Sequence, residues 1–321
     1  MSTLGSGPDG HLAVTSTSDA TTASDAIDLD GYRAATLPGG RTVEYLVEGD
    51  PDGFPLVFHH GTPGAAVPYA YLSGVARERG LALVVASRPG YGMSGAHPGR
   101  RVIDIATDVA GVLDDLGCDD FITLGWSGGG PHALASAAGL PQRCRAAAVG
   151  AGVAPFHATG LEFFEGMGAE NIVEYNAAVA GRAELERLLE HEPAKYGSIS
   201  ADQVAAALGD LASPADKAFA TGEFASRLLA SINRGLAFGI EGWVEDGLAF
   251  TRPWGIELGD ISVPVSVWHG TADWTVPFAH GEWLAAHVAG AVAHLYENEG
   301  HLSLWSQVAV IIDDLIRQAG L

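Results

Sequence analysis

The fold of this chain is decided by Phe121-Ile-Thr-Leu-Gly125-Trp126-Ser127-Gly128-Gly129-Gly130-Pro131-His132-Ala133. An apolar, β-prone run leads into a glycine-rich turn, and a helix-prone run of alanines follows. This order of strand, sharp turn and helix is what a G-x-S-x-G nucleophile elbow requires. A serine there sits at strained backbone angles, and a side chain two residues to either side would collide with the adjoining strand or helix. An ordinary glycine-rich turn is the alternative reading.

The helix expected to begin at Gly128 has a further chemical consequence. Its free N–H groups and the positive end of its dipole would point at the oxygen of Ser127, where negative charge develops during acyl transfer. A site of this kind also needs a base, an acid and a second donor for the oxyanion. The rest of the chain must supply them.

Composition limits the class of protein. The 321 residues, 47% hydrophobic and 17% charged, are enough for one large α/β domain with an inserted subdomain or for two small domains. The net charge of −22 leaves no basic patch for phosphates, so we expect no nucleic-acid partner and no anionic membrane surface. Two cysteines without metal-ligand spacing, no long apolar run and no secretory signal pattern predict a cytoplasmic protein with no metal site.

The pattern of apolar runs divides the chain. Residues 1–28 are polar, and we expect them to form a disordered N-terminal tail. In residues 29–154 and 256–321, continuous apolar runs alternate with helical segments, which predicts an α/β core with a mostly parallel sheet flanked by helices.

Residues 155–255 differ from this core. They contain no convincing strand, but they do contain recognisable helix starts. Ser200 with Gln203 has the pattern of a capping box, and Ser213 followed by Pro214 is typical of an N-cap with proline at the first helical position. The segment is therefore predicted to be a helical cap inserted into the core.

Three residues follow the predicted carboxyl ends of parallel strands: Ser127, Asp273 and His301. In open α/β sheets that edge is where ligands bind, so the three side chains should converge there. Their chemistry is complementary. A serine hydroxyl attacks a carbonyl only when a histidine takes its proton, and a carboxylate fixes the imidazole tautomer and stabilises the imidazolium. The sequence thus predicts a Ser-Asp-His catalytic triad.

The oxyanion needs two backbone donors. One is expected to be the N–H of Gly128, the residue after the nucleophile. The other is expected from the turn His60-Gly61-Thr62-Pro63-Gly64, where Pro63 has no N–H and the preceding glycine allows close approach. We assign the N–H of Thr62. His60 itself either contacts the ligand or holds the turn as a structural hydrogen-bonding group.

These motifs together resemble the α/β-hydrolase superfamily, specifically enzymes with a helical cap inserted after the sixth strand. The matching pieces, in the family's order, are His60-Gly61-Thr62-Pro63-Gly64, Arg88-Pro89-Gly90-Tyr91-Gly92-Met93-Ser94, Gly125-Trp126-Ser127-Gly128-Gly129, His269-Gly270-Thr271-Ala272-Asp273 and Gly300-His301. The resemblance implies the α/β-hydrolase fold with an eight-stranded sheet, and a cofactor-free serine hydrolase. It does not identify the substrate, because this fold hosts many reactions.

Departures from the family pattern narrow the chemistry. Serine in place of aspartate at the elbow excludes the usual haloalkane dehalogenase and epoxide hydrolase mechanisms. Trp126 precedes the serine, whereas proline iminopeptidases typically have Gly-Gly-Ser-Trp-Gly, which argues against peptidase activity. Ser87 stands where family members often carry aspartate, so we expect a local salt bridge to be missing there.

The substrate pocket is the part of the site that the sequence determines least. Candidate substrate-binding residues, which either line an apolar acyl pocket or form the core of the cap, are His60, Trp126, Phe156, Phe163, Phe164 and Met167. Four glutamates of the cap either hold a substrate amine or form a solvated face: Glu162, Glu165, Glu170 and Glu174. We expect Asp246 and Trp254 to anchor the cap and His132 to be a packing residue.

The function expected from the sequence is hydrolysis of a small or medium carboxylic ester or lactone through an acyl-enzyme, with a small-molecule substrate and no cofactor. A proline-iminopeptidase-like aminopeptidase or amidase is the first alternative. A ligand receptor that keeps the triad is an alternative of another class, and a cofactor-free lyase or perhydrolase is a third. Monomer and homodimer both remain open.

Overall fold

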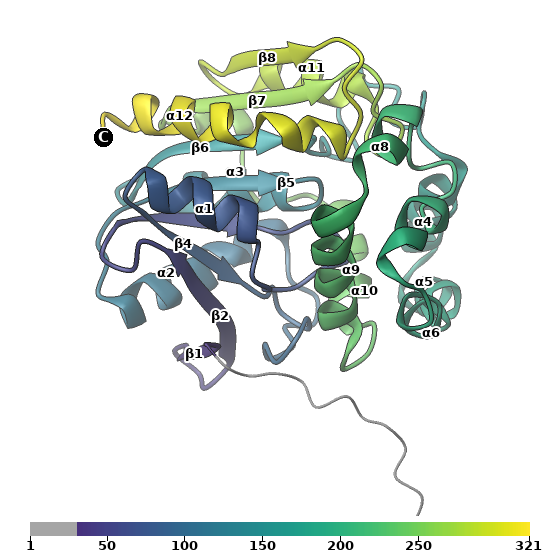
Figure 1. Cartoon of the computed structure of the whole chain (residues 1–321), viewed down its shortest axis with the longest axis horizontal. Coiled ribbons are helices and arrows are strands. Elements are labelled where there is room, and N and C mark those ends of the chain that lie inside the picture. Colours follow the sequence, from purple (N-terminus) through teal and green to yellow (C-terminus); the bar gives the residue numbers. More distant parts are fainter. Residues whose placement is uncertain (1–30) are drawn as a thin grey trace, which may run out of the picture. The chain divides into compact units, whose positions relative to one another are not determined.

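One central sheet organises the computed structural model of the chain, which describes residues 31–321 (Figure 1). The tail expected at residues 1–28 lies outside the described residues. The strands are β1 (Arg33–Thr36), β2 (Thr42–Gly49), β3 (Phe54–His59), β4 (Leu81–Ala86), β5 (Phe121–Trp126), β6 (Cys144–Gly150), β7 (Val265–Gly270) and β8 (Val292–Tyr296).

The strand order is β1-β2-β4-β3-β5-β6-β7-β8. Strand β2 runs antiparallel to both of its neighbours, and all pairs from β4 to β8 are parallel. The predicted mostly parallel, eight-stranded sheet is therefore confirmed. In the register, Gly125 of β5 lies opposite both His59 of β3 and Val149 of β6, so the chain just before Ser127 is held between two strands.

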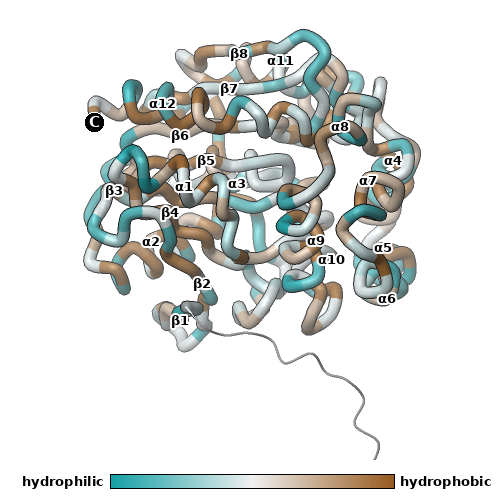
Figure 2. The backbone as a smooth tube through the Cα atoms, viewed as in Figure 1, coloured by the Kyte–Doolittle hydropathy of each residue, from teal (hydrophilic) through white to brown (hydrophobic). Residues whose placement is uncertain are grey.

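Helices cover both faces of this sheet. One face is covered by α1 (Ala70–Glu78) and α12 (Val308–Ala319), the other by α2 (Ile105–Leu116), α3 (Gly129–Gly139) and α11 (Phe278–His287). Successive residues of β5 alternate between the faces: Phe121 packs on the α2 side and Ile122 on the α12 side. Both faces of the central strands are buried, which explains why strands such as β3 and β4 are continuous apolar runs. Hydrophobic stretches accordingly gather where the sheet and its helices meet (Figure 2).

The segment between β6 and β7 contains helices and turns but no strand, as expected. We call residues 155–255 the cap. Its helices are α4 (Ala169–Ala180), α5 (Arg182–Leu189), α6 (Glu192–Gly197), α7 (Val204–Ala207), α8 (Pro214–Phe219), α9 (Gly222–Leu236) and α10 (Glu241–Phe250). Both predicted helix starts are present, because capping boxes occur at Ser200 and at Ser213. Short 3₁₀ helices occur at Val102–Asp104, Ala201–Gln203, Leu258–Asp260 and Ser303–Gln307.

A buried charge pair joins the cap to β2. The hydroxyl of Ser87 donates to Glu44 Oε1 at 2.8 Å, and Arg234 of α9 pairs with the other oxygen of the same carboxylate. A carboxylate of β2 thus lies beside Ser87, the position where family members often carry aspartate, and it forms a salt bridge with the cap.

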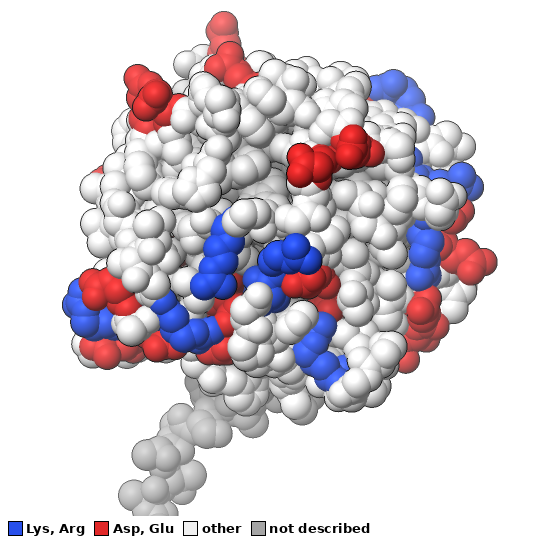
Figure 3. Space-filling view, turned by 180° about the vertical axis from the view of Figure 1, so that it is seen from behind, with Lys and Arg blue, Asp and Glu red and all other residues white. Residues whose placement is uncertain are grey.

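The surface carries charges of both signs. On the face of the molecule shown in Figure 3, Lys and Arg side chains lie beside Asp and Glu side chains. Arg143 pairs with Asp114 at 2.8 Å, and Arg145 pairs with Asp120 at 2.9 Å. Within residues 31–321, no helix is long and apolar enough to cross a membrane.

Candidate active site

The expected site residues lie just beyond four parallel strands. Thr62 follows β3, Ser127 follows β5, Asp273 follows β7 and His301 follows β8. Parallel strands end at one edge of a sheet, so these segments come together there. Ser127, His301 and Thr62 line the same cavity, and Asp273 binds His301.

The turn at Ser127 has the geometry of a nucleophile elbow. The serine has φ = 56°, in the left-handed region that non-glycine residues rarely occupy. A Cβ at Gly125 would collide with the carbonyl oxygen of Gly129, and one at Gly129 with that of His59 in β3. The glycines thus allow strand, turn and helix α3 to pass closely enough to hold the strained serine. The structure thus has the order of strand, sharp turn and helix that the sequence predicts here.

His301 is bound to Asp273. The Nδ1 of His301 donates to Asp273 Oδ2 at 2.8 Å, and both side chains are buried. The other oxygen of Asp273 accepts from the backbone N–H groups of Thr275 at 2.9 Å and Val276 at 2.8 Å. The carboxylate is therefore fixed from two sides. With the proton on Nδ1, the Nε2 of the neutral imidazole is free to accept one.

The two groups shift each other's pKa in opposite directions. Burial alone would raise the pKa of Asp273, but the charge of His301 and hydrogen bonds from His269 and His301 lower it to about 2. Burial alone would lower the pKa of His301, but the charge and hydrogen bond of Asp273, together with the charge of Asp216, raise it above its ordinary value. The pair is therefore arranged to stabilise an imidazolium.

The turn after β3 lies against the elbow. A Cβ built at Gly61 would be 3.5 Å from the Cβ of Ser127, and one built at Gly128 would be 2.9 Å from the Cβ of Thr62. Within residues 31–321, the backbone N–H of Thr62 donates to no other group. Thr62 and Gly128 thus lie next to each other beside the serine, where we expect the two donors of an oxyanion hole.

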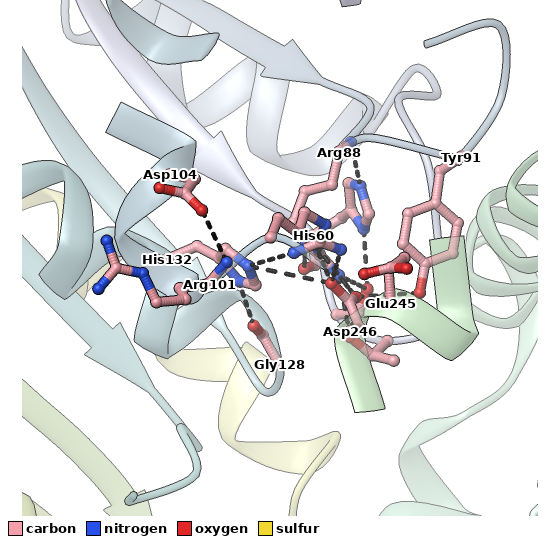
Figure 4. A network of polar contacts seen from close by, with 12 residues as sticks. His60, Arg88, Tyr91, Arg101, Asp104, Gly128, His132, Glu245 and Asp246 are labelled. Carbon is pink, nitrogen blue, oxygen red and sulfur yellow. Dashed lines mark hydrogen bonds and ion pairs between the residues drawn. The ribbon is translucent and has the colours of Figure 1, made fainter. Parts of the chain in front are cut away.

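Asp246 of α10 binds this turn from beneath (Figure 4). Its Oδ2 accepts from the Thr62 hydroxyl at 2.7 Å, from Arg88 Nη2 at 2.6 Å and from the Tyr91 hydroxyl at 2.9 Å. Arg100 pairs with the other oxygen. Burial alone would raise the pKa of Asp246, but the charges of Arg88 and Arg100 hold it well below its ordinary value. The expectation that Asp246 anchors the cap agrees with these contacts.

Two buried histidines support the same region. His60 donates from Nδ1 to the carbonyl of Gly61 at 2.8 Å, and His132 donates from Nδ1 to the carbonyl of Gly128 at 2.8 Å (Figure 4). Burial and the charge of Arg88 lower the pKa of both imidazoles well below the ordinary value. Both are therefore neutral groups that hold the backbone. His60 does not line the cavity, so its role as a substrate contact is corrected to a structural one.

A cavity of about 930 Å³ lies between the cap and this edge of the sheet. Its lining includes Ser127, Gly128 and Trp126 from the core, and the cap adds mostly apolar and aromatic side chains. The apolar and aromatic cap side chains in this lining include Tyr175, Phe224, Leu228, Ile232, Trp243 and Phe250. Of the sequence-predicted pocket residues, Trp126 is in place.

The four other aromatic and sulfur-containing candidates are not in the lining. Phe156, Phe163, Phe164 and Met167 belong to a separate apolar cluster, in which Phe156 and Phe163 have ring centroids 4.9 Å apart. They lie in the segment of turns between β6 and α4, and Phe156 and Phe163 also contact Tyr175 of α4. Of the two roles that the sequence left open for them, acyl pocket or core packing, these contacts agree with core packing. Trp254 likewise packs in the main core, away from the cavity.

Of the four cap glutamates, Glu170 and Glu174 line the cavity, and Glu162 and Glu165 do not. Glu174 Oε1 accepts from the indole N–H of Trp243 at 2.6 Å. Desolvation raises the pKa of Glu174 to about 7. A carboxyl group that changes charge near neutrality thus sits in the cavity wall.

One buried residue near His301 was not predicted from the sequence. Asp216 of α8 accepts hydrogen bonds from the backbone of residues 301–303. The sequence signal present, a serine followed three residues later by an acidic residue, predicts only a helix start.

Residues 31–321 contain no group of three or more His, Cys, Asp and Glu side chains placed to hold a metal ion.

Comparison with known proteins agrees with this architecture. Residues 55–307 match the family model described as the alpha/beta hydrolase fold. A relative from Streptomyces lividans named a non-heme chloroperoxidase is 27% identical and covers 88% of this chain and 97% of its own length. Two solved structures share the fold. An esterase from Exiguobacterium antarcticum (19% identity, TM-score 0.63) covers 90% of this chain and 99% of its own. An enol-lactonase from Burkholderia xenovorans (20% identity, TM-score 0.63) covers 90% and 100%.

Proposed function

Because this chain belongs to the alpha/beta hydrolase fold family, we propose that it is a serine hydrolase that cleaves small or medium carboxylic esters or lactones through an acyl-enzyme. Family membership supports hydrolase chemistry in general. The finer proposal rests on one observation: a serine at a strained elbow and a histidine bound to a buried carboxylate line the same cavity. The mostly apolar lining suits an apolar acyl group.

Each step has a residue to perform it. The Ser127 oxygen attacks the ester carbonyl carbon while Nε2 of His301 takes the hydroxyl proton, and Asp273 stabilises the resulting imidazolium. The N–H groups of Thr62 and Gly128 bind the oxyanion of the tetrahedral intermediate. His301 then gives the proton to the leaving alcohol. Water attacks the acyl-enzyme in the same way, with His301 again as base.

Glutamates in the cavity wall, among them Glu170 and Glu174, favour a second candidate, an aminopeptidase or amidase. Glu170 and Glu174 line the cavity, where a carboxylate can bind a substrate amine. The Trp243 indole already binds Glu174, and the raised pKa of Glu174 leaves it largely protonated below pH 7. A neutral carboxyl group holds an amine poorly, so we place this candidate second.

The deciding experiment compares wild type with Ser127→Ala on p-nitrophenyl esters, lactones and aminoacyl-arylamides. We expect ester or lactone turnover by wild type and a loss of about six orders of magnitude in kcat for Ser127→Ala, with unchanged folding. Comparable turnover by the variant would contradict the assignment of Ser127 as the nucleophile. Preference for aminoacyl-arylamides would support the second candidate.

A ligand receptor on the same scaffold gives a different result. It would react once with a fluorophosphonate probe at Ser127 but would show no steady-state turnover of any ester in the panel. Labelling and turnover are therefore measured on the same preparation.

A further inference from the structure

One carboxylate of the cap lies against the turn that carries His301. Asp216 stands in the first turn of α8 and is fully buried. Its Oδ2 accepts from the backbone N–H of Ser213 at 3.1 Å and from the Ser213 hydroxyl at 2.9 Å. The bond from the backbone N–H belongs to a capping box, so part of the residue's role is to start the helix.

The same carboxylate accepts three more hydrogen bonds that a helix start does not require. The donors are successive backbone N–H groups: His301 at 3.1 Å, Leu302 at 2.7 Å and Ser303 at 2.9 Å. A Cβ at Gly300 would collide with the carboxylate, so glycine at this position allows α8 to approach the turn. A segment of the cap thus holds a core turn more than eighty residues further along the chain.

Three convergent donors restrain the turn strongly. Hydrogen bonds to an ionised acceptor are roughly twice as strong as bonds between neutral groups. Because the N–H of His301 is itself one of the donors, the bonds fix the backbone from which the imidazole projects. Asp273 holds the other end of the residue through Nδ1 at 2.8 Å. Backbone and ring are therefore fixed by two different carboxylates.

We propose that Asp216 is a positioning residue for His301, which makes helix α8 of the cap part of the catalytic apparatus. It holds the turn in the orientation that proton transfer with Ser127 needs. This inference rests on the proposed function, in which His301 moves a proton. It goes beyond that function because it assigns a mechanistic role to a residue that touches no substrate.

The charge of Asp216 gives the inference a measurable signature. Its charge raises the pKa of His301, adding to the larger effect of Asp273. The other titratable groups around this turn are His269, 3.4 Å from Asp273, and Glu299, which accepts a hydrogen bond from the same turn at 2.6 Å. Both remain in an Asp216→Asn variant. That substitution keeps the size of the side chain and removes its charge.

The test measures kcat, KM and the pH dependence of kcat/KM for Asp216→Asn in the full chain. We expect kcat to fall about 10- to 100-fold with KM little changed, because the imidazole is misplaced by less than about 1 Å. We also expect the acid limb of kcat/KM to move to lower pH. A matched control is Asp104→Asn, since Asp104 accepts from the N–H of Arg101 at 2.7 Å in another capping box, and within residues 31–321 it makes no hydrogen bond to the His301 turn.

Two outcomes contradict the inference. The first is that Asp216→Asn has the kcat and the acid limb of wild type. The second is that Asp104→Asn changes kcat and the acid limb as much as Asp216→Asn does. If Asp216→Asn does not fold, the Asp216→Glu variant tests the proposal instead. It keeps the charge but displaces the oxygens, so kcat should fall while the acid limb stays in place. A wild-type kcat in Asp216→Glu overturns the proposal.

A direct titration separates this inference from the proposed function. The imidazole of His301 can be followed by proton NMR, its signal assigned by its loss in His301→Asn. A lower pKa in Asp216→Asn supports the positioning role even if no ester is hydrolysed. Absence of ester turnover by wild type would refute the proposed function alone.

Discussion

Asp246 of α10 accepts a hydrogen bond of 2.7 Å from the hydroxyl of Thr62, whose backbone N–H we assign to the oxyanion. Thr62→Val removes this bond, together with the one of 2.9 Å that the hydroxyl accepts from Arg88 Nη2, and keeps the shape of the side chain. We expect kcat for p-nitrophenyl esters to fall about 10-fold, since a small shift of the turn weakens a bond made mainly in the transition state. Thr62→Ser should keep most of the activity.

The control is Tyr91→Phe. It removes another hydrogen bond, of 2.9 Å, to the same carboxylate without touching the oxyanion turn. Each variant should lose about 1 kcal/mol of stability. Equal losses of kcat in Thr62→Val and Tyr91→Phe would mean that the bond to Thr62 has no special role.

Removal of the Asp246 carboxylate should be far more destabilising than removal of a surface one. Asp246→Ala leaves Arg88 and Arg100 buried without their partner, and breaking a buried pair in this way costs about 3–5 kcal/mol. Urea denaturation measures the loss. Asp120→Ala, which breaks the exposed pair with Arg145, should cost about 1 kcal/mol or less. Similar losses in the two variants would argue against the anchoring role.

The pH dependence of activity should follow His301. The base acts only when neutral, and its pKa is raised, so the acid limb of kcat/KM should lie above the ordinary histidine value of 6.5. Asp273→Asn removes the carboxylate that raises this pKa, so the limb should move to lower pH. We also expect kcat to fall by about four orders of magnitude, as in other Ser-His-Asp sites. An acid limb unchanged in Asp273→Asn would contradict the assigned pairing.

Glu174 should make the protein less stable as the pH rises through neutrality. Its pKa is 4.5 in the unfolded chain and about 7 in the folded protein, so the folded state binds more protons between these values. Stability therefore falls from about pH 4.5 to about pH 7 because of this group. Glu174→Gln removes the titration, and its Tm relative to wild type should rise with pH over that window. A difference in Tm that is constant with pH would show that the group does not titrate there.

The elbow could be predicted from the sequence because its constraints are local. A side chain at the glycines around Ser127 would collide with groups within a few residues or in the adjoining strand, so a short motif is enough to predict the elbow. Asp273 and His301 followed from a topological rule, since each comes just after a parallel strand. The central strands were predictable for a similar reason, because strands such as β3 and β4 are short, continuous apolar runs.

The cavity lining could not be predicted in this way. Phe156 and Phe163 have the composition of an acyl pocket but pack on each other, whereas Leu228 and Trp243 reach the cavity from helices whose packing no local pattern determines. Asp216 shows the same limit. Its pattern with Ser213 is visible in the sequence, but its three donors lie in a turn that only the fold brings near.

The two buried aspartates of the cap limit how this protein can be re-engineered. Asp216 and Asp246 contact the His301 turn and the Thr62 turn, so the cap cannot be exchanged as an independent module. A cap grafted from another family member to change the substrate would leave Arg88 and Arg100 unpaired and three amides of the His301 turn without an acceptor. Grafts that retain both carboxylates at the junction should fold and turn over. Substrate range is better redesigned through the side chains that line the cavity, such as Trp126 and Tyr175, with both carboxylates kept.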